Sequence, residues 1–165
     1  MRFAILVLLF TAGCAPTIMQ VGIAPEDLSA ARAALQPGDA VITGSAVLRQ
    51  QAGGAVTCAG AEVYLIPATS SATRELVRVF GGEDGYVRRG GTTTVGGGTL
   101  VAPPEPHRTA LCNAQGFFRF GDLRAGRWHI ITTVVWAAGE NYQGGTILVT
   151  TEVASGQEVE VVLSR

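Results

Sequence analysis

The sequence contains no lysine, because all twelve of its basic residues are arginines. This absence excludes lysine chemistry such as Schiff-base catalysis, and also the lysine-dependent phosphate binding of P-loops. Charged residues make up only 15% of the chain, where about 25% is usual, whereas hydrophobic residues make up 47%. This balance argues against intrinsic disorder and against a solvated coiled coil. The net charge of -1 offers no basic field, so we expect no nucleic-acid partner.

Motifs of common catalytic sites are also missing. The sequence has no HExxH metal motif, no GxGxxG dinucleotide motif and no GxSxG nucleophile elbow. The glycine run at 96–98 is not followed by a lysine, so it is no phosphate-binding loop. Neighbouring carboxylates such as Glu158 and Glu160 fit a solvated strand face. We therefore expect no enzyme activity, no catalytic residue, no metal ligand and no cofactor.

Turn residues, in contrast, are abundant. The chain contains 22 glycines and 7 prolines, many of which separate short runs rich in valine and threonine. This pattern favours β structure with many turns over helices. A length of 165 residues is enough for one domain of ordinary size and short for two.

The N-terminus has the pattern of an export signal. Arg2 precedes an apolar run at 3–10, which is too short to span about 30 Å of hydrocarbon as a helix. A basic start, a short apolar core and small residues before a cleavage site are typical of a secretory signal peptide. Residues 11–13 (TAG) and the following Cys14 resemble the lipobox of bacterial lipoproteins, although Thr11 stands where that family usually has an aliphatic residue. An ordinary cleaved signal with a free cysteine is the alternative.

The lipobox resemblance implies lipidation of Cys14 and anchoring of the protein to a membrane. The next residue is Ala15, whereas an aspartate there would suggest retention in the inner membrane. We therefore expect a place in the cell envelope, at the outer membrane and facing the periplasm or the surface. Several acyl chains anchor a protein far more firmly than one.

The two remaining cysteines, Cys58 and Cys112, lie 54 positions apart. An even pair in an exported protein predicts a disulfide, because export leads to an oxidising compartment. In the chain-entropy model, closing a loop of this length stabilises the fold by about 4 kcal/mol. A metal site is the alternative, but two isolated thiols without CxxC spacing are weak evidence for zinc.

We divide the chain into three parts. Residues 1–13 form the lipoprotein signal peptide, residues 14–39 a tether with a short helix, and residues 40–165 a single β-sandwich domain. The boundaries follow the end of the small-residue signal and the start of the first strand-like run.

Two short helices are expected. The first covers about 25–35, because proline and two acidic residues suit its first turn and apolar residues recur on one face. Residues 15–24 before it are interpreted as the tether. Helical spacing of apolar residues predicts a second helix over 70–80, with Ser70 or Ser71 as its N-cap.

About seven strands are expected, separated by turns as in a β-sandwich. The run 127–137 is apolar on both faces, which indicates a central strand. Trp128 and Trp136 share one face of it and are interpreted as the two ends of its core-facing side, with a sugar-binding platform as the alternative. Residues 81–106 are rich in glycine and proline and are expected to form a long loop, in which 92–95 could pair weakly as an edge strand. The expected strands cover 40–49, 61–66, 109–112, 117–120, 127–137, 146–153 and 157–163.

Four short motifs resemble the carboxypeptidase regulatory-like domain, in which a G-A-x-V-x-L pattern precedes D-x-x-G-x-F-x-F-x-x-L-x-x-G-x-Y. The match extends over about 40–165, and its second half is the more specific. Asn113 stands where the family usually has aspartate, and Trp128 where it usually has tyrosine. The segment 68–108 is an insertion relative to the pattern. The motifs are GSAV at 44–47, AGAEVYLIP at 59–67, NAQGFFRF at 113–120 and GDLRAGRW at 121–128.

This resemblance implies an all-β, prealbumin-like (transthyretin-like) Greek-key sandwich. Members of the family lack catalysis and act as accessory modules, so the expected partner is an envelope protein or a glycan. The alternative is a metal-dependent or small-molecule enzyme, because intradiol dioxygenases hold iron with two tyrosines and two histidines on a similar sandwich. Their histidines are spaced as HxH, whereas His107 and His129 lie 22 positions apart. We expect His129 to be packed in the strand or to lie at its rim.

Three residues are candidates for facing a ligand. Arg88 and Arg89 lie beside a glycine-rich loop and could meet an anion. Tyr142 lies in a loop expected over 137–145. Loops in general tend to carry binding residues, which makes these positions candidates.

Overall fold

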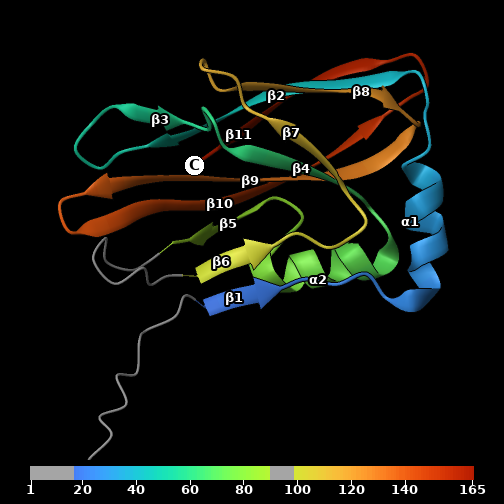
Figure 1. The fold of residues 1–165 in the computed structure, drawn as a ribbon, viewed down its shortest axis with the longest axis horizontal. Coiled ribbons are helices and arrows are strands. Elements are labelled where there is room, and N and C mark those ends of the chain that lie inside the picture. Colours follow the sequence, from blue (N-terminus) through green and yellow to red (C-terminus); the bar gives the residue numbers. More distant parts are fainter. Residues whose placement is uncertain (1–16, 90–98) are drawn as a thin grey trace, which may run out of the picture.

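The computed structural model describes residues 17–89 and 99–165, which build two facing β-sheets with a helix and a two-stranded ribbon on the outer side of one sheet (Figure 1). The signal sequence and Cys14 lie outside these residues. The strands are β1 (Thr17–Gln20), β2 (Ala40–Arg49), β3 (Ala55–Thr57), β4 (Glu62–Pro67), β5 (Gly85–Arg88), β6 (Thr99–Ala102), β7 (Arg108–Leu111), β8 (Phe117–Leu123), β9 (Gly126–Ala138), β10 (Asn141–Val153) and β11 (Glu158–Ser164). The helices are η1 (Pro25–Asp27), α1 (Leu28–Ala34) and α2 (Ser70–Phe80).

The expected all-β sandwich is confirmed, with eleven strands in the described residues instead of about seven. The additional strands β1, β3, β5 and β6 have only three or four residues each, too few to show an alternating pattern. The prediction of a loop over 81–106 was therefore wrong for the residues of β5 and β6. The expected edge strand at 92–95 lies outside the described residues. In the described part of the chain, no helix has the length and apolar character needed to cross a membrane.

The larger sheet has the order β5-β10-β9-β4-β7, and the smaller one places β2 between β11 on one edge and β8 and β3 on the other. β9 pairs with both β10 and β4, which confirms it as a central strand. One face of β9 packs toward the smaller sheet with Trp128, Ile130 and Val134, all of which are at most 1% exposed. These residues meet Phe118 and Phe120 of β8 in the main core.

The other face of the larger sheet carries a second core beneath α2. Leu76 of α2 is fully buried and packs with Ile66 of β4, Ile131 of β9 and Leu148 of β10. The helix predicted over 70–80 is confirmed, but its N-cap is Thr69, whose side chain accepts from the backbone N–H of Ala72. The expected serine caps were wrong.

Ser71, one of the expected caps, has a different role. Its N–H and its hydroxyl each donate to Asp27 Oδ2 at 2.7 Å, and its oxygen accepts from Ala24 N at 3.0 Å. These bonds join the start of α2 to the segment around η1. The helix expected over 25–35 is present as η1 and α1.

The expectations for two connecting segments were wrong. Residues 17–20, expected within the tether, form β1, which pairs in parallel with β6 from Thr17↔Thr99 to Gln20↔Ala102. Residues 137–145, expected as a loop, belong mostly to the β9–β10 hairpin, whose paired residues extend to Ala138↔Asn141. The chain is therefore part of the folded domain from Thr17 onward.

The predicted disulfide is confirmed between Cys58 and Cys112, with a Cα–Cα distance of 5.8 Å. Cys58 follows β3 and Cys112 follows β7, so the bond joins the two sheets. The turn between β7 and β8 comes directly after this bond. Asn113 Oδ1 accepts from the N–H of Phe117 at 2.9 Å, and Gly116 takes a φ of 87°. This turn directs Phe118 into the main core.

Candidate functional site

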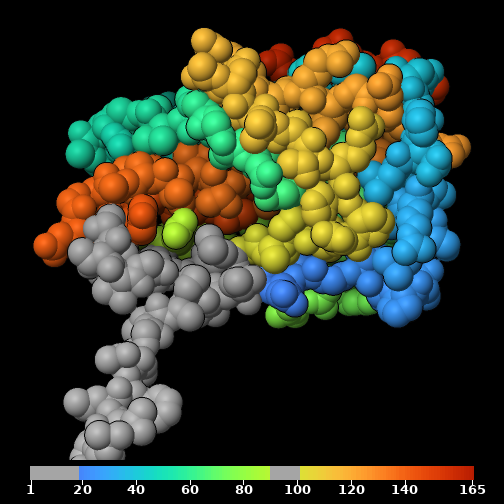
Figure 2. Space-filling view, viewed as in Figure 1, coloured from blue at the N-terminus to red at the C-terminus, as the bar shows by residue number. Residues whose placement is uncertain are grey.

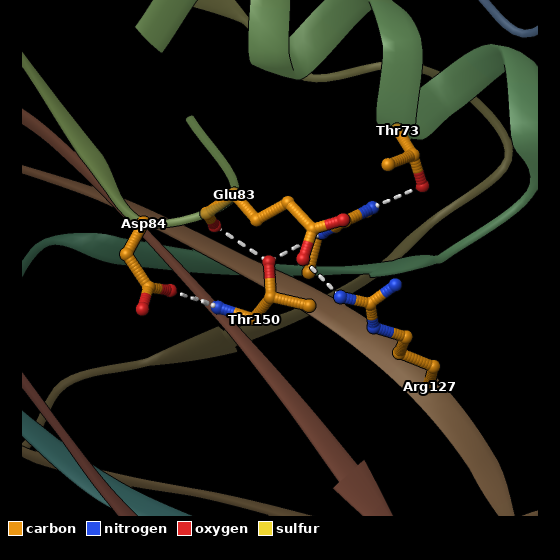
Figure 3. A network of polar contacts seen from close by, with 6 residues as sticks. Thr73, Glu83, Asp84, Arg127 and Thr150 are labelled. Atoms are coloured by element: carbon orange, nitrogen blue, oxygen red, sulfur yellow. Dashed lines mark hydrogen bonds and ion pairs between the residues drawn. The ribbon is translucent and has the colours of Figure 1, made fainter. Parts of the chain in front are cut away.

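His129 is the centre of a polar network between β9, β10, α2 and the segment before β5 (Figure 3). Its side chain is fully buried, with 0% exposure. Its Nε2 lies 2.8 Å from Thr73 Oγ1 on α2, and its Nδ1 lies 2.8 Å from Thr150 Oγ1 on β10. Thr150 Oγ1 donates its only proton to the carbonyl of Glu83 at 2.6 Å, so it accepts from Nδ1. The neutral ring then accepts at Nε2 from Thr73.

The surroundings of His129 keep its ring uncharged. Burial, and after it the charge of Arg127, lowers the pKa of His129 to about 4, although Glu83 and Asp84 act in the opposite direction. Glu83 forms an ion pair with Arg127, and Asp84 Oδ1 accepts from the N–H of Thr150 at 2.8 Å. These contacts hold the segment before β5 against the sheet. His129 is thus packed between elements and has no opening toward a ligand.

The other histidine lies elsewhere. His107 Nδ1 is 3.1 Å from the carbonyl oxygen of Pro104, and its ring stands edge-on to Tyr64 with centroids 5.2 Å apart. Within 17–89 and 99–165, no three histidine, cysteine, aspartate or glutamate side chains are grouped so that they could hold a metal ion.

The structure brings two of the three candidate ligand-facing residues together. The guanidinium carbon of Arg89 lies 4.7 Å from the centre of the Tyr142 ring, a cation–π contact. Arg89 N–H donates to the carbonyl of Gly144 at 2.9 Å, which extends the β5–β10 pairing by one residue. Arg88 pairs with Gly145, so its side chain points to the opposite face of the sheet. The two arginine side chains therefore extend from opposite faces of β5 at its end.

A hollow of about 420 Å³ lies on the outer face of the larger sheet, beside the part that α2 covers. We call it the Tyr64 hollow. One wall comes from β4 and β9, and the other from the end of β6 and the residues after it. Its lining residues are Ala61, Glu62, Tyr64, Val101, Ala102, Pro103 and Thr133.

Polar groups are few in the Tyr64 hollow and are held in place. Tyr64, which is half-buried, donates from its hydroxyl to Glu62 Oε2. Burial, followed by the hydrogen bond and charge of Glu62, raises the pKa of Tyr64 to about 12. The phenol therefore keeps its proton, and the exposed carboxylate of Glu62 is oriented by it. Thr133 adds a hydroxyl that is 2.9 Å from Thr146 Oγ1. The remaining lining is apolar.

This arrangement suits a polyhydroxylated ligand with an apolar face. The half-buried tyrosine ring and the Val101–Pro103 wall can contact carbon-bound hydrogens, while a fixed carboxylate accepts from hydroxyl groups. A pocket that is mainly apolar with a few placed polar groups is the usual form of a small-ligand site. This hollow was not predicted from the sequence, because Glu62 and Tyr64 only mark the polar face of a strand and 101–103 lie in the expected loop.

A smaller hollow of about 270 Å³ lies where the β2–β3 turn meets the β9–β10 hairpin. Trp136 and Gln143, which are register partners on these strands, share it with Gln50 and Gln51. When the amide of Gln50 is oriented to satisfy both of its groups, it accepts from Trp136 Nε1 at 3.2 Å. We call this the Trp136 hollow.

Comparison with solved structures found a likeness in fold, whereas comparison of the sequence with known families found none. No family model and no curated protein matches the sequence. Among solved structures, the chain is similar to the crystal structure of a "putative carbohydrate binding protein" from Pseudomonas aeruginosa, with 25% identity and a TM-score of 0.64. The likeness covers 86% of this chain and 97% of that chain. It thus extends over nearly the whole sandwich and is not limited to one motif.

Proposed function

We propose that this protein is a lipid-anchored component of the bacterial cell envelope whose β-sandwich is a non-catalytic module that binds a glycan in the Tyr64 hollow. In this proposal the sandwich is of the carboxypeptidase regulatory-like type, Cys14 carries the lipid, and the protein is held at the outer membrane. The sequence leaves open whether the partner is an envelope protein or a glycan, and we propose the glycan.

The observation that carries the proposal is the Tyr64–Glu62 pair inside a mostly apolar hollow. The ring offers a flat apolar surface, and the carboxylate that it orients is an acceptor for sugar hydroxyls. The name of the structural neighbour, a protein described as binding carbohydrate, agrees with this class of ligand. The disulfide between Cys58 and Cys112 agrees with an exported protein.

The glycan proposal is tested with the acylated protein in detergent, by saturation-transfer NMR against a panel of neutral and acidic disaccharides. We expect at least one disaccharide to bind, and Tyr64→Ala to abolish its signal. Tyr142→Ala is the matched control, because it removes another half-buried tyrosine from the same sheet and should leave the signal unchanged. Binding that survives in Tyr64→Ala and disappears in Trp136→Leu would place the site in the Trp136 hollow and contradict the proposal.

The anchor proposal is tested by labelling cells with a radioactive fatty acid. The wild type should be labelled and Cys14→Ser should not. An unlabelled wild-type protein, or a labelled Cys14→Ser variant, would contradict lipidation.

The competing function is that of a metal-dependent or small-molecule enzyme on the same sandwich. Metal analysis of the purified protein distinguishes it from a binding module. Stoichiometric iron or zinc that is lost in His107→Ala or His129→Ala would overturn the non-catalytic proposal.

A further inference from the structure

The position of β1 limits how far the domain can stand from a membrane anchor. Thr17 is only three residues after Cys14, and three residues of fully extended chain span at most about 10 Å. β1 is not a free segment, because it pairs with β6 along its whole length. A lipid on Cys14 therefore holds the folded sandwich itself at the membrane surface, with the start of β1 toward the lipid.

The start of β1 lies on the side of the molecule away from α1 (Figure 1). The end of β5 points to the same side, and the β9–β10 hairpin projects furthest there, beside the β2–β3 turn (Figure 2). β5 ends at Arg88 and is followed by Arg89, while Tyr142 stands near the hairpin turn. We call Arg88, Arg89 and Tyr142 the basic end.

The chemistry of the basic end fits the surface of an anionic bilayer. Neither arginine forms an ion pair with a carboxylate in the described residues, and Arg88 is exposed while Arg89 is half-buried. Guanidinium groups bind phosphate oxygens well, and tyrosine prefers the level of the lipid headgroups. A single carboxylate, that of Glu140, lies in the hairpin turn.

We propose that the basic end lies against the bilayer in which the protein is anchored, and that Arg88 and Arg89 bind the phosphate groups of anionic phospholipids. This inference rests on the lipidation of Cys14 proposed above. The net charge of the protein is only -1, so an anionic surface orients it through a local pair of cations and not through a general attraction. The Tyr64 hollow, on the outer face of the larger sheet, then remains free for a ligand beside the membrane.

Fluorescence of Trp136 can report the orientation, because Trp136 lies two residues from the end of β9 at this side, whereas Trp128 is 1% exposed. The acylated protein is reconstituted into phosphatidylglycerol vesicles that contain phosphatidylcholine spin-labelled at the headgroup. The emission of Trp136 is the difference between the wild type and Trp136→Phe. We expect the spin label to quench at least half of it. The double variant Arg88→Glu/Arg89→Glu should reduce this quenching at least two-fold, and Arg88→Glu alone should reduce it less.

Arg32→Glu reverses one charge at an exposed site on α1, as Arg88→Glu does at the basic end, so it is the matched control for that single variant and should leave quenching unchanged. Quenching that is absent, or that is the same in the double variant, would overturn the inference. Flotation of the wild type on pure phosphatidylcholine vesicles in high salt tests the anchor separately. A protein that does not float lacks the lipid, whereas one that floats without quenching is anchored with another face toward the bilayer.

Discussion

Two halves of one sheet face behave differently in this protein. Under α2, the outer face of the larger sheet presents Ile66 and Ile131, which are buried. It also presents His129, whose neutral ring has a hydrogen-bond partner at each nitrogen. A few residues along the same strands, Tyr64 and Thr133 face a hollow instead. Because β4 and β9 run through both halves, the difference comes from what covers them. Where α2 covers the sheet, around Ile66, Ile131 and His129, the face is buried, and we call this part the sealed half. Where α2 ends, the face lines the Tyr64 hollow, and we call this part the open half.

The largest expected effect comes from opening the sealed half. Leu76→Ala removes a fully buried side chain from α2 and should lower the free energy of unfolding by about 2–5 kcal/mol. Urea denaturation measures this loss. Disaccharide binding by the variant that remains folded should be unchanged, and a loss of binding in parallel with stability would show that the two halves are not separate.

The buried histidine should make the sealed half sensitive to acid. The folded pKa of His129, about 4, lies below its ordinary value of 6.5, so the unfolded chain binds the proton more tightly. The contribution of neutral His129 to stability is therefore fully present above pH 6.5. The free energy of unfolding should fall by about 3 kcal/mol as the pH drops from 6.5 through 4. Urea denaturation across this range measures the fall.

The matched variant for the pH dependence is His129→Asn. It should have a lower stability at pH 7 but a much shallower loss between pH 6.5 and 4. A variant with the slope of the wild type would show that other groups cause the acid sensitivity. The effects of Asp27 and Asp39 can be separated from that of His129. Hydrogen bonds lower the pKa values of these two carboxyl groups, so their effect on stability appears at more acidic pH.

A smaller effect is expected at the edge of the sealed half. Thr69→Ala removes the N-cap of α2 and should cost about 1 kcal/mol. Ser70→Ala is the control, because Ser70 is exposed and does not cap the helix. Thermal unfolding of both variants checks this, and equal losses would contradict the assignment of the cap.

The smallest effect on stability is expected in the open half. Tyr64→Phe removes the hydroxyl that donates to the exposed Glu62 and should change the free energy of unfolding by less than about 1 kcal/mol. Disaccharide affinity should nevertheless fall about ten-fold, because the carboxylate loses its fixed position. Calorimetric titration measures the affinity, and an unchanged value would remove Tyr64–Glu62 from the site.

Long periodic segments were predictable from the sequence, because many residues contribute to one pattern. The helix over 70–80 and the central strand around Trp128 are examples. The N-cap was wrong because Thr69 and the serines after it offer the same chemistry, and only the backbone at Thr69 is extended. β1 and β6 were missed because their pairing joins segments about eighty positions apart, and neither run is long enough to signal a strand alone.

The candidate site was less predictable than the fold. Arg88, Arg89 and Tyr142 stood out because they lie in expected loops, yet pairing in β5 places the two arginines on opposite faces. The Tyr64 hollow depends on where α2 ends and on a wall from the end of β6, and both are tertiary features. A sequence signal existed only in the spacing of Glu62 and Tyr64 on one strand face.

The most direct test of the open half as the binding site is to map amide chemical shifts while a disaccharide that binds is titrated into the acylated protein. The predicted result is a cluster of shifts at Glu62, Tyr64, Thr133 and 101–103, with the α2-covered residues around His129 unchanged. Shifts centred on Trp136 and Gln143, or spread evenly over both halves of the sheet face, would contradict the claim that the open half is the binding site.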